Sequence, residues 1–344
     1  MHASSPRLVP SVPAAGRILF AISQRELDLF LPDVRLSERI DVVDPTRLGP
    51  DEDWRGVLLR VAPAVIVSGW TTPPLPADWL AREDCPLRYV CHLSGSVRRL
   101  VPRGFIERGG WVTNWGGLAA PLVAEHALLL ALASLRDLAS WLGERGAAAG
   151  IGVQTALTRT LFGRRVGVHG CGGVARHLAR LLAPFGCDIV CWSRGVPDDV
   201  VRSAGMTPAA SIEELFTDRD VLFECEALVP GDEGWINASL LARLPDGALF
   251  VNVGRGRMMD EPALLAEALS GRLRVALDVL IVEPPPPGSP WWTVKGTILS
   301  PHIAGPTRDM MPRIGAFAMD NLERFLSGQA LREPVTLEIY DRAT

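Results

Sequence analysis

The chain has 344 residues, of which 48% are hydrophobic and 22% charged, with a formal net charge of −4 and a pI near 5.9. This length exceeds an ordinary single domain and supplies apolar residues for two hydrophobic cores. A nucleic-acid partner requires a basic surface, whereas this chain has a net negative charge, so nucleic-acid binding is not expected.

Cysteine spacing and hydropathy restrict the chain further. Its six cysteines are scattered rather than paired at metal-ligand or disulfide spacing, so we expect reduced thiols, no metal site and a cytoplasmic location. Residues 1–15 contain no continuous apolar segment of the kind that a secretory signal needs. The longest apolar stretch, Leu118–Leu135, includes Glu125 and His126, which suits a buried helix better than a membrane span.

Short runs rich in β-branched residues alternate with helical patterns, which predicts an α/β fold with parallel sheets covered on both faces. The expected strands before residue 114 are Arg17–Ile22, Ala64–Ser68, Arg88–Leu93 and Trp111–Thr113. A long helix is expected over about Leu118–Leu142. The next expected elements are strand Val166–His169, helix Val174–Pro184 and strands Asp188–Trp192, Val221–Phe223, Ala248–Asn252, Val275–Asp278 and Thr297–Ser300. A helix over Asp309–Leu326 and a short strand-like tail complete two α/β units, the second nested in the first if the last helix packs back on the N-terminal part.

A glycine-rich segment, GCGGVA, follows the strand that opens the second unit. It places Gly170, Gly172 and Ala175 in the spacing G-x-G-x-x-G/A between a predicted strand and a predicted helix. Gly170 permits a tight turn, Gly172 lets the backbone approach a pyrophosphate, and the helix N-terminus offers free N–H groups. The segment predicts a dinucleotide site, and the alternative is a glycine-rich turn without a ligand.

The end of the next strand bears on the choice of dinucleotide. An NAD-selective site usually places Asp or Glu there, whereas this chain has Ser193 and Arg194. A hydroxyl and a guanidinium can bind a 2′-phosphate, so we expect NADP(H) in preference to NAD(H). NAD(H) remains possible if Arg194 is solvated and stacks on the adenine.

Three later segments carry acid–base chemistry. Arg255, Glu283 and His302 each follow a predicted strand, and the carboxyl ends of parallel strands share one edge of a sheet. Arg255 can bind a carboxylate and polarise a keto oxygen. His302 can donate a proton, and a nearby Glu283 would orient the imidazole and keep it protonated near neutral pH. Taken singly, the alternatives are a loop-capping Arg, a solvated Glu and a structural His.

Together these motifs resemble the D-isomer-specific 2-hydroxyacid dehydrogenases. The resemblance covers roughly Leu87 to Leu326 and rests on TNWGGLAAPLVAEHALLLALASLR, the GCGGVA segment, the stretch from GWINASLL to NVGRG, and the Glu283 and His302 segments. It implies two Rossmann-like domains: 1–114 as the first part of the substrate domain, 115–305 as the dinucleotide-binding domain, and 306–344 as a C-terminal helix and tail returning to the substrate domain. It also implies a homodimer that uses the helix near residues 118–142.

The resemblance assigns site residues as well. The catalytic residues are Arg255, Glu283 and His302. The cofactor-binding residues are Gly170, Cys171, Gly172, Gly173, Val174, Ser193, Arg194, Cys225, Val253, Gly254, Asp278, His302 and Gly305. Asp278 corresponds to the carboxylate that holds the nicotinamide amide, and the alternative is a strand-end Asp bonded to backbone. The substrate-binding residues are Ser94, Gly95, Ser96, Arg255 and His302.

Several positions depart from the family pattern. The substrate loop has Arg98 and Arg99 where the family usually has Asp and Asn, and these arginines either face an anionic tail or form a solvated helix start. Ser68 stands where phosphoglycerate enzymes of the family commonly carry Arg. In FECEALVP, Cys225 and Ala227 replace the usual His and Pro near the cofactor ribose.

The sequence therefore predicts an NAD(P)-dependent oxidoreductase that reduces a small anionic 2-keto acid to a 2-hydroxy acid. A phosphonate or another unusual anion is an alternative substrate, because of Arg98 and Arg99. A catalytically silent NAD(H)-binding regulator is a third possibility from a different class.

Overall fold

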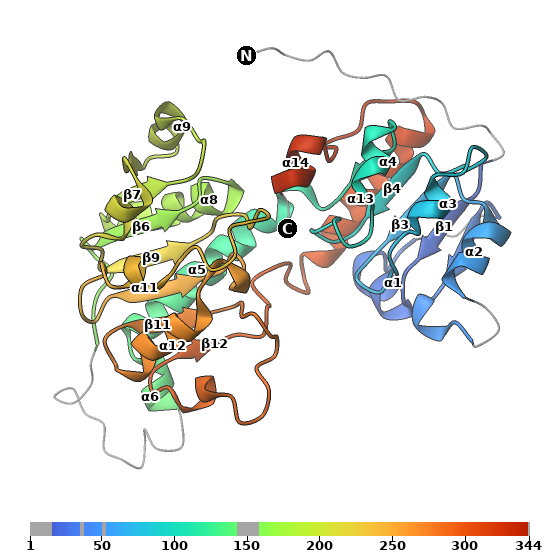
Figure 1. The fold of residues 1–344 in the computed structure, drawn as a ribbon. Helices are drawn as coiled ribbons and strands as arrows, with labels where there is room; N and C mark the ends of the chain where they lie inside the picture. Colours follow the sequence, from blue (N-terminus) through green and yellow to red (C-terminus); the bar gives the residue numbers. More distant parts are fainter. Residues whose placement is uncertain (1–15, 35–37, 50–52, 143–157, 343–344) are drawn as a thin grey trace. The chain divides into compact units, whose positions relative to one another are not determined.

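The computed structural model describes residues 16–34, 38–49, 53–142 and 158–342 (Figure 1). It divides into two compact units. Unit 1 contains the described residues up to Ala119 and those from Thr307 onward, and unit 2 contains those from Ala120 to Pro306. The second unit is thus inserted into the first. The boundary expected after residue 114 falls five residues before the observed one, and the boundary expected after residue 305 falls one residue before it.

Unit 1 is built on a parallel sheet in the order β2-β1-β3-β4-β5. Its strands are β1 (Ile18–Ala21), β2 (Ile40–Val43), β3 (Val65–Ser68), β4 (Tyr89–His92) and β5 (Trp111–Thr113). Alternate residues of these strands face opposite sides, as the period of two requires. Phe20 and Val67 pack toward α1 (Gln24–Phe30) and α13 (Met311–Leu326). Leu19 and Ile66 pack toward α2 (Trp54–Val61), α3 (Ala77–Leu80), α4 (Arg103–Glu107) and α14 (Leu337–Arg342).

Unit 2 is built on a seven-stranded parallel sheet in the order β12-β11-β10-β9-β6-β7-β8. Its strands are β6 (Arg165–His169), β7 (Asp188–Trp192), β8 (Thr207–Pro208), β9 (Val221–Glu224), β10 (Leu249–Asn252), β11 (Arg274–Leu277) and β12 (Ile298–Leu299). Its helices are α5 (Ala120–Leu135), α6 (Leu138–Leu142), α8 (Gly173–Leu182), α9 (Asp198–Ser203), α10 (Ile212–Phe216), α11 (Ala238–Leu241) and α12 (Glu261–Leu269). The strand order reverses between β6 and β9, and ligands of open α/β sheets bind outside the strand ends at such a point.

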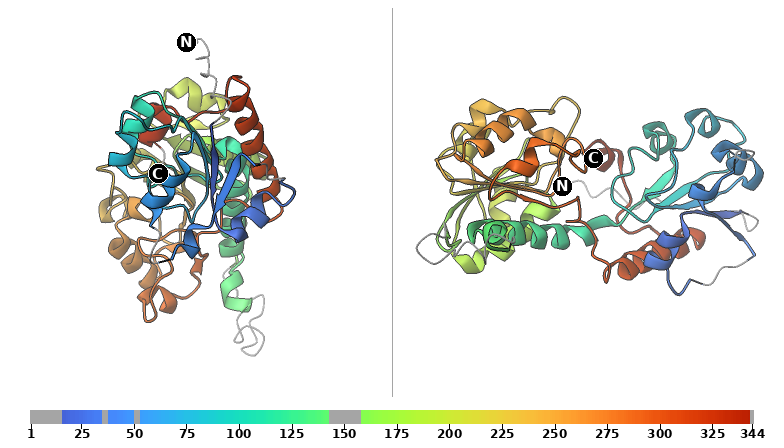
Figure 2. Two further views of the ribbon diagram at one scale, coloured as in Figure 1. Left: turned by 90° about the vertical axis from the view of Figure 1, so that its right-hand side faces the viewer. Right: turned by 90° about the horizontal axis from the view of Figure 1, so that it is seen from below.

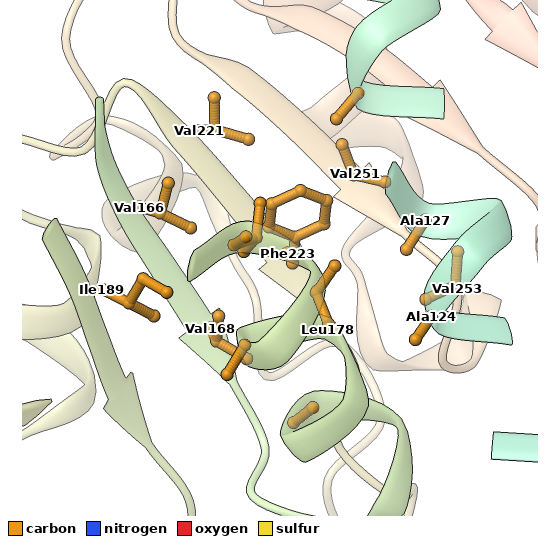
Figure 3. Packing of buried hydrophobic residues seen from close by; sticks show 14 of the residues in the cluster. Ala124, Ala127, Val166, Val168, Leu178, Ile189, Val221, Phe223, Val251 and Val253 are labelled. Carbon is orange, nitrogen blue, oxygen red and sulfur yellow. The ribbon is translucent and has the colours of Figure 1, made fainter. Parts of the chain in front are cut away.

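Helices cover both faces of the unit 2 sheet (Figure 2). On one face, Phe223 and Val168 pack against Leu178 of α8 and Ala127 of α5 (Figure 3). On the other face, Leu222 belongs to a second buried cluster with residues of α10, α11 and α12. The expected α/β class with two parallel-sheet domains is confirmed.

Two expected elements were wrong in detail. The long helix near residues 118–142 is a 3₁₀ turn (Gly116–Ala119) followed by α5 and α6, because Asp137 adopts a left-handed conformation (φ 57°) that ends α5. The strand-like tail contributes one bridge, Pro334 to Thr113, and then turns into α14. Its Tyr340 donates a hydrogen bond to the Val101 carbonyl (2.8 Å), so tertiary contacts override the alternating pattern.

Gly116–Leu135 is long and apolar enough to cross a membrane by length and composition alone. Ala124, Ala127 and Leu130 of this stretch are buried in the core of unit 2. These contacts are those of a core helix, which passes the same test of length and composition.

Candidate functional site

The glycine-rich turn after β6 has the backbone that a dinucleotide cradle requires. Gly170 has φ 103°, a conformation that favours glycine. Gly172 is the N-cap of α8, and a Cβ added there would meet no atom within 4 Å. The open space beside Gly172 and the free amides at the start of α8 suit the pyrophosphate of a nicotinamide dinucleotide.

Three strand ends meet at this turn. The Gly170 amide donates to the Trp192 carbonyl at the end of β7 (2.8 Å), and the Cys225 amide donates to the His169 carbonyl (2.9 Å). A Cβ on Gly170 would lie 2.8 Å from the Glu226 amide nitrogen, so the segment after β9 abuts the turn. The residues that follow β6, β7 and β9 therefore lie together.

All of the expected cofactor residues lie at this edge of the sheet. Each follows the carboxyl end of a strand of unit 2: Gly170 to Val174 after β6, Ser193 and Arg194 after β7, Cys225 after β9, Val253 and Gly254 after β10, Asp278 after β11, and His302 and Gly305 after β12. Ser94, Gly95 and Ser96 follow β4 and belong to unit 1.

Glu283 connects the predicted acid–base residues. Its Oε2 lies 2.6 Å from His302 Nδ1, and its Oε1 accepts a hydrogen bond from the Leu280 amide (2.8 Å). Burial lowers the pKa of Arg255, and the charge of Glu283 acts on this pKa in the opposite direction. A methyl group on Gly256 would overlap the backbone of Leu280, so the Arg255 turn packs directly against the segment that leads to Glu283.

His302 is held in an uncommon conformation. Its φ is 53°, in the left-handed region, and its amide hydrogen-bonds the Asp278 and Ser300 carbonyls. Half of its side chain is exposed (50%), against 30% for Glu283. Backbone strain of this kind is concentrated at functional sites, where the surrounding structure maintains it.

Asp278 anchors the loop that carries His302. Its carboxylate accepts hydrogen bonds from Ser300 Oγ (2.6 Å) and from the amides of Ile303 and Ala304 (both 2.9 Å). Burial would raise the pKa of Asp278, but bonds from His126, Ser300 and the two amides lower it below its ordinary value. The alternative of a strand-end Asp bonded to backbone thus describes its contacts, because these four partners account for the roughly four acceptor sites of a carboxylate.

In unit 1, the predicted substrate loop is fixed by a histidine. His92 ends β4, its Nδ1 lies 2.9 Å from Ser68 Oγ, and its Nε2 lies 2.6 Å from Ser94 Oγ. Burial lowers the pKa of His92 to about 4, so the ring is neutral at physiological pH. Ser68, which stands where phosphoglycerate enzymes of the family commonly carry an arginine, therefore contacts a neutral imidazole.

The two unusual arginines of this loop have different surroundings. Arg98 donates to the carbonyls of Tyr340 (3.0 Å) and Asp341 (2.7 Å), so it holds the last turn of α14. Neither an anionic tail nor a solvated helix start describes Arg98, since α4 begins at Arg103. Arg99 is exposed.

Sequence reasoning missed four polar residues around the cradle. His169 and Glu224 end the paired strands β6 and β9 and contact each other at 2.5 Å with fully buried side chains. Glu226 accepts a hydrogen bond from Ser193, and Asp232 forms an ion pair with Arg194. The available signal was Glu224, a charged residue at the end of the apolar run VLFE. Its partner, His169, depends on strand register, which cannot be derived from the sequence.

The family model described as "D-isomer specific 2-hydroxyacid dehydrogenase, NAD binding domain" matches residues 127–304, about half of the chain. The chain belongs to the D-isomer-specific 2-hydroxyacid dehydrogenase family. This match covers the turn after β6 and all three of Arg255, Glu283 and His302.

Individual members of the family are distant relatives. D-3-phosphoglycerate dehydrogenase of Mycobacterium leprae is 27% identical over 292 residues, which are 84% of this chain and 54% of the relative. The chain thus spans about half the length of such relatives. Hydroxypyruvate reductase of Thermotoga maritima is 30% identical over 221 residues, 61% of this chain and 68% of the relative. The crystal structure of the TT0316 protein from Thermus thermophilus matches with a TM-score of 0.73 and 25% identity, covering 93% of this chain and all of that one.

Proposed function

We propose that this protein is an NAD(P)-dependent oxidoreductase that reduces a small 2-keto acid to the 2-hydroxy acid in a reversible reaction. The observation that carries the proposal is the contact of Glu283 with His302, in the same unit as the cradle and within electrostatic reach of Arg255. The named relatives are dehydrogenases and reductases, which favours this function over a phosphonate-specific enzyme or a silent regulator.

Each residue has a defined role in the proposed reaction. The bound nicotinamide supplies or accepts the hydride. Arg255 binds the substrate carboxylate and polarises the keto oxygen, where negative charge develops. With Nδ1 bonded to Glu283, His302 presents Nε2, which donates a proton to that oxygen and retrieves it in the reverse direction. Asp278 positions the His302 loop through its bonds to Ser300 Oγ and the amides of Ile303 and Ala304.

The substrate that we propose is a small monoanionic acid without a phosphate. Two observations in unit 1 support this choice: Ser68 and Ser94 bind a neutral His92, and Arg98 is engaged by the carbonyls of α14. The backbone amides of Ser94, Gly95 and Ser96 are then the proposed contacts for the substrate carboxylate on this unit.

A substrate panel tests the proposal. NADH and NADPH oxidation is followed in parallel with glyoxylate, hydroxypyruvate, phenylpyruvate, 2-ketoisocaproate and phosphonopyruvate. We expect turnover with at least one of the first four acids and weaker turnover with phosphonopyruvate. Nucleotide binding without turnover of any acid would contradict the enzyme and favour the regulator.

A further inference from the structure

Both groups that would recognise a 2′-phosphate are already bound to carboxylates. Ser193 Oγ donates a hydrogen bond to Glu226 Oε2 (2.5 Å), and Arg194 Nη1 donates to Asp232 Oδ1 (2.7 Å). Both carboxylates come from the segment after β9, whereas Ser193 and Arg194 directly follow β7. The pair that predicted NADP(H) from the sequence is therefore engaged within the protein.

Glu226 is well placed to meet the adenosine ribose. The segment that carries it abuts Gly170, and Gly170 is bonded to the end of β7 that carries Ser193. In a dinucleotide fold, this side of the glycine-rich turn receives the adenosine ribose. The Glu226 carboxylate is also held in place, because its Oε1 accepts a hydrogen bond from the Ala227 amide (3.0 Å).

Arg194 would have to give up contacts within the protein in order to bind a ligand phosphate. The Asp232 side chain is 6% exposed, so removal of Arg194 would leave a buried carboxylate without its cation. The Arg194 guanidinium also lies 3.9 Å from the centre of the Trp235 ring, a cation–π contact. Trp235 in turn packs edge-on against Trp192 at 5.3 Å, which fixes the ring.

The net charge of this region is unfavourable for a phosphate. His169 and Glu224 lie beside it as a buried pair at 2.5 Å. Burial raises the pKa of Glu224, and although burial lowers that of His169, the charge of Glu224 raises it above its ordinary value. Arg194, Glu226 and Asp232 together carry one net negative charge, which repels a further anion but accepts hydrogen bonds from hydroxyls.

We propose that Glu226, held by Ser193, binds the adenosine ribose hydroxyls and makes this site selective for NAD(H) over NADP(H). Glu226 thereby replaces the acid that NAD-selective folds usually carry at the end of the second strand, the position of Ser193. Arg194 neutralises Asp232 instead of a phosphate. This inference rests on the proposed function only in requiring that a nicotinamide dinucleotide binds.

The test is a direct measurement of nucleotide affinity on the full chain, without substrate. Dissociation constants for NADH and NADPH are obtained by calorimetry or by quenching of tryptophan fluorescence. We expect wild-type protein to bind NADH at least ~10-fold more tightly than NADPH. Glu226→Gln keeps the shape and the bond from Ser193 but removes the charge, so the preference is expected to shrink by ~10-fold.

Glu233→Gln is the matched control. It removes one negative charge from the same segment, but Glu233 is exposed and accepts a hydrogen bond from the nearby Gly231 amide. The preference of E233Q for NADH over NADPH should equal that of wild type. If E226Q does not fold, Ser193→Ala provides the second variant: the charge of Glu226 remains, so NADH is still preferred.

The outcomes separate this inference from the proposed function. Equal or tighter binding of NADPH by wild type would overturn the inference, as would an E226Q preference identical to that of E233Q. NADPH preference in S193A would overturn it as well. Failure of wild type to bind either nucleotide would instead overturn the proposed function.

Discussion

The two units each hold a histidine at the carboxyl edge of their sheet, and the two residues have opposite properties. His92 of unit 1 is buried between the hydroxyls of Ser68 and Ser94, and burial lowers its pKa to about 4. His302 of unit 2 is half exposed, has a left-handed backbone and contacts Glu283. The partner and the exposure of the ring, rather than its place in the topology, distinguish a neutral structural imidazole from a proton donor.

A third histidine separates these two factors. His169 has a carboxylate partner, Glu224, but both side chains are fully buried. It therefore has the electrostatic partner of His302 and the burial of His92. An acid–base role requires a carboxylate partner together with access to a substrate, and of these three histidines only His302 combines them.

The largest expected effect follows from removal of the exposed imidazole. His302→Ala deletes the proposed proton donor, so kcat should fall by ~100-fold or more. NADH affinity should stay nearly unchanged, because the cradle and Glu226 are intact. Steady-state kinetics with the best acid of the panel and a binding titration measure the two quantities.

The control is His177→Ala, which removes a partly buried imidazole on the cofactor helix α8. Its kcat should remain close to that of wild type. Equal rates for H302A and H177A would show that His302 is not the proton donor.

A smaller effect, on stability, is expected from the buried histidine. His92→Phe leaves two buried hydroxyls without their partner, so the free energy of unfolding should fall by about 1–3 kcal/mol at pH 7.5. In the wild type, the pKa of His92 is about 4 in the folded state and 6.5 in the unfolded state, so between these pH values the unfolded state binds one more proton than the folded state. Wild-type stability should therefore decrease as pH falls from 6.5 toward 4, and the variant should lose this dependence.

Urea unfolding at several pH values measures both quantities, with NADH affinity as the check that unit 2 is intact. A pH dependence that is identical in wild type and H92F would contradict a neutral, buried His92.

The sequence predicted the parts of this molecule that depend on local pattern. The α/β class and the turn at Gly170 follow from periodicity and glycine spacing, which are properties of contiguous residues, whereas the nesting of one unit in the other was implied by the resemblance to the family. The loops of Arg255, Glu283 and His302 were also identified, because each directly follows a strand.

What the sequence could not predict depends on contacts between distant segments. Glu226 and Asp232 reach Ser193 and Arg194 across the sheet edge, so a pair that suggested phosphate binding has protein partners instead. Arg98 binds carbonyls of Asp341 and Tyr340, more than 240 residues away along the chain. Strand order and register decide such partners, and neither can be derived from one sequence.

The most direct test of the contrast between the two histidines is ¹⁵N NMR of the imidazole rings during a pH titration, on wild type and Glu283→Gln. We expect His92 to stay neutral until the pH approaches 4 and to be unaffected by E283Q. We expect His302 to carry a proton on Nδ1, and we expect its signals to change in E283Q because the acceptor of that proton loses its negative charge. Unchanged His302 signals in E283Q, or a His92 that titrates near its ordinary 6.5, would contradict the account.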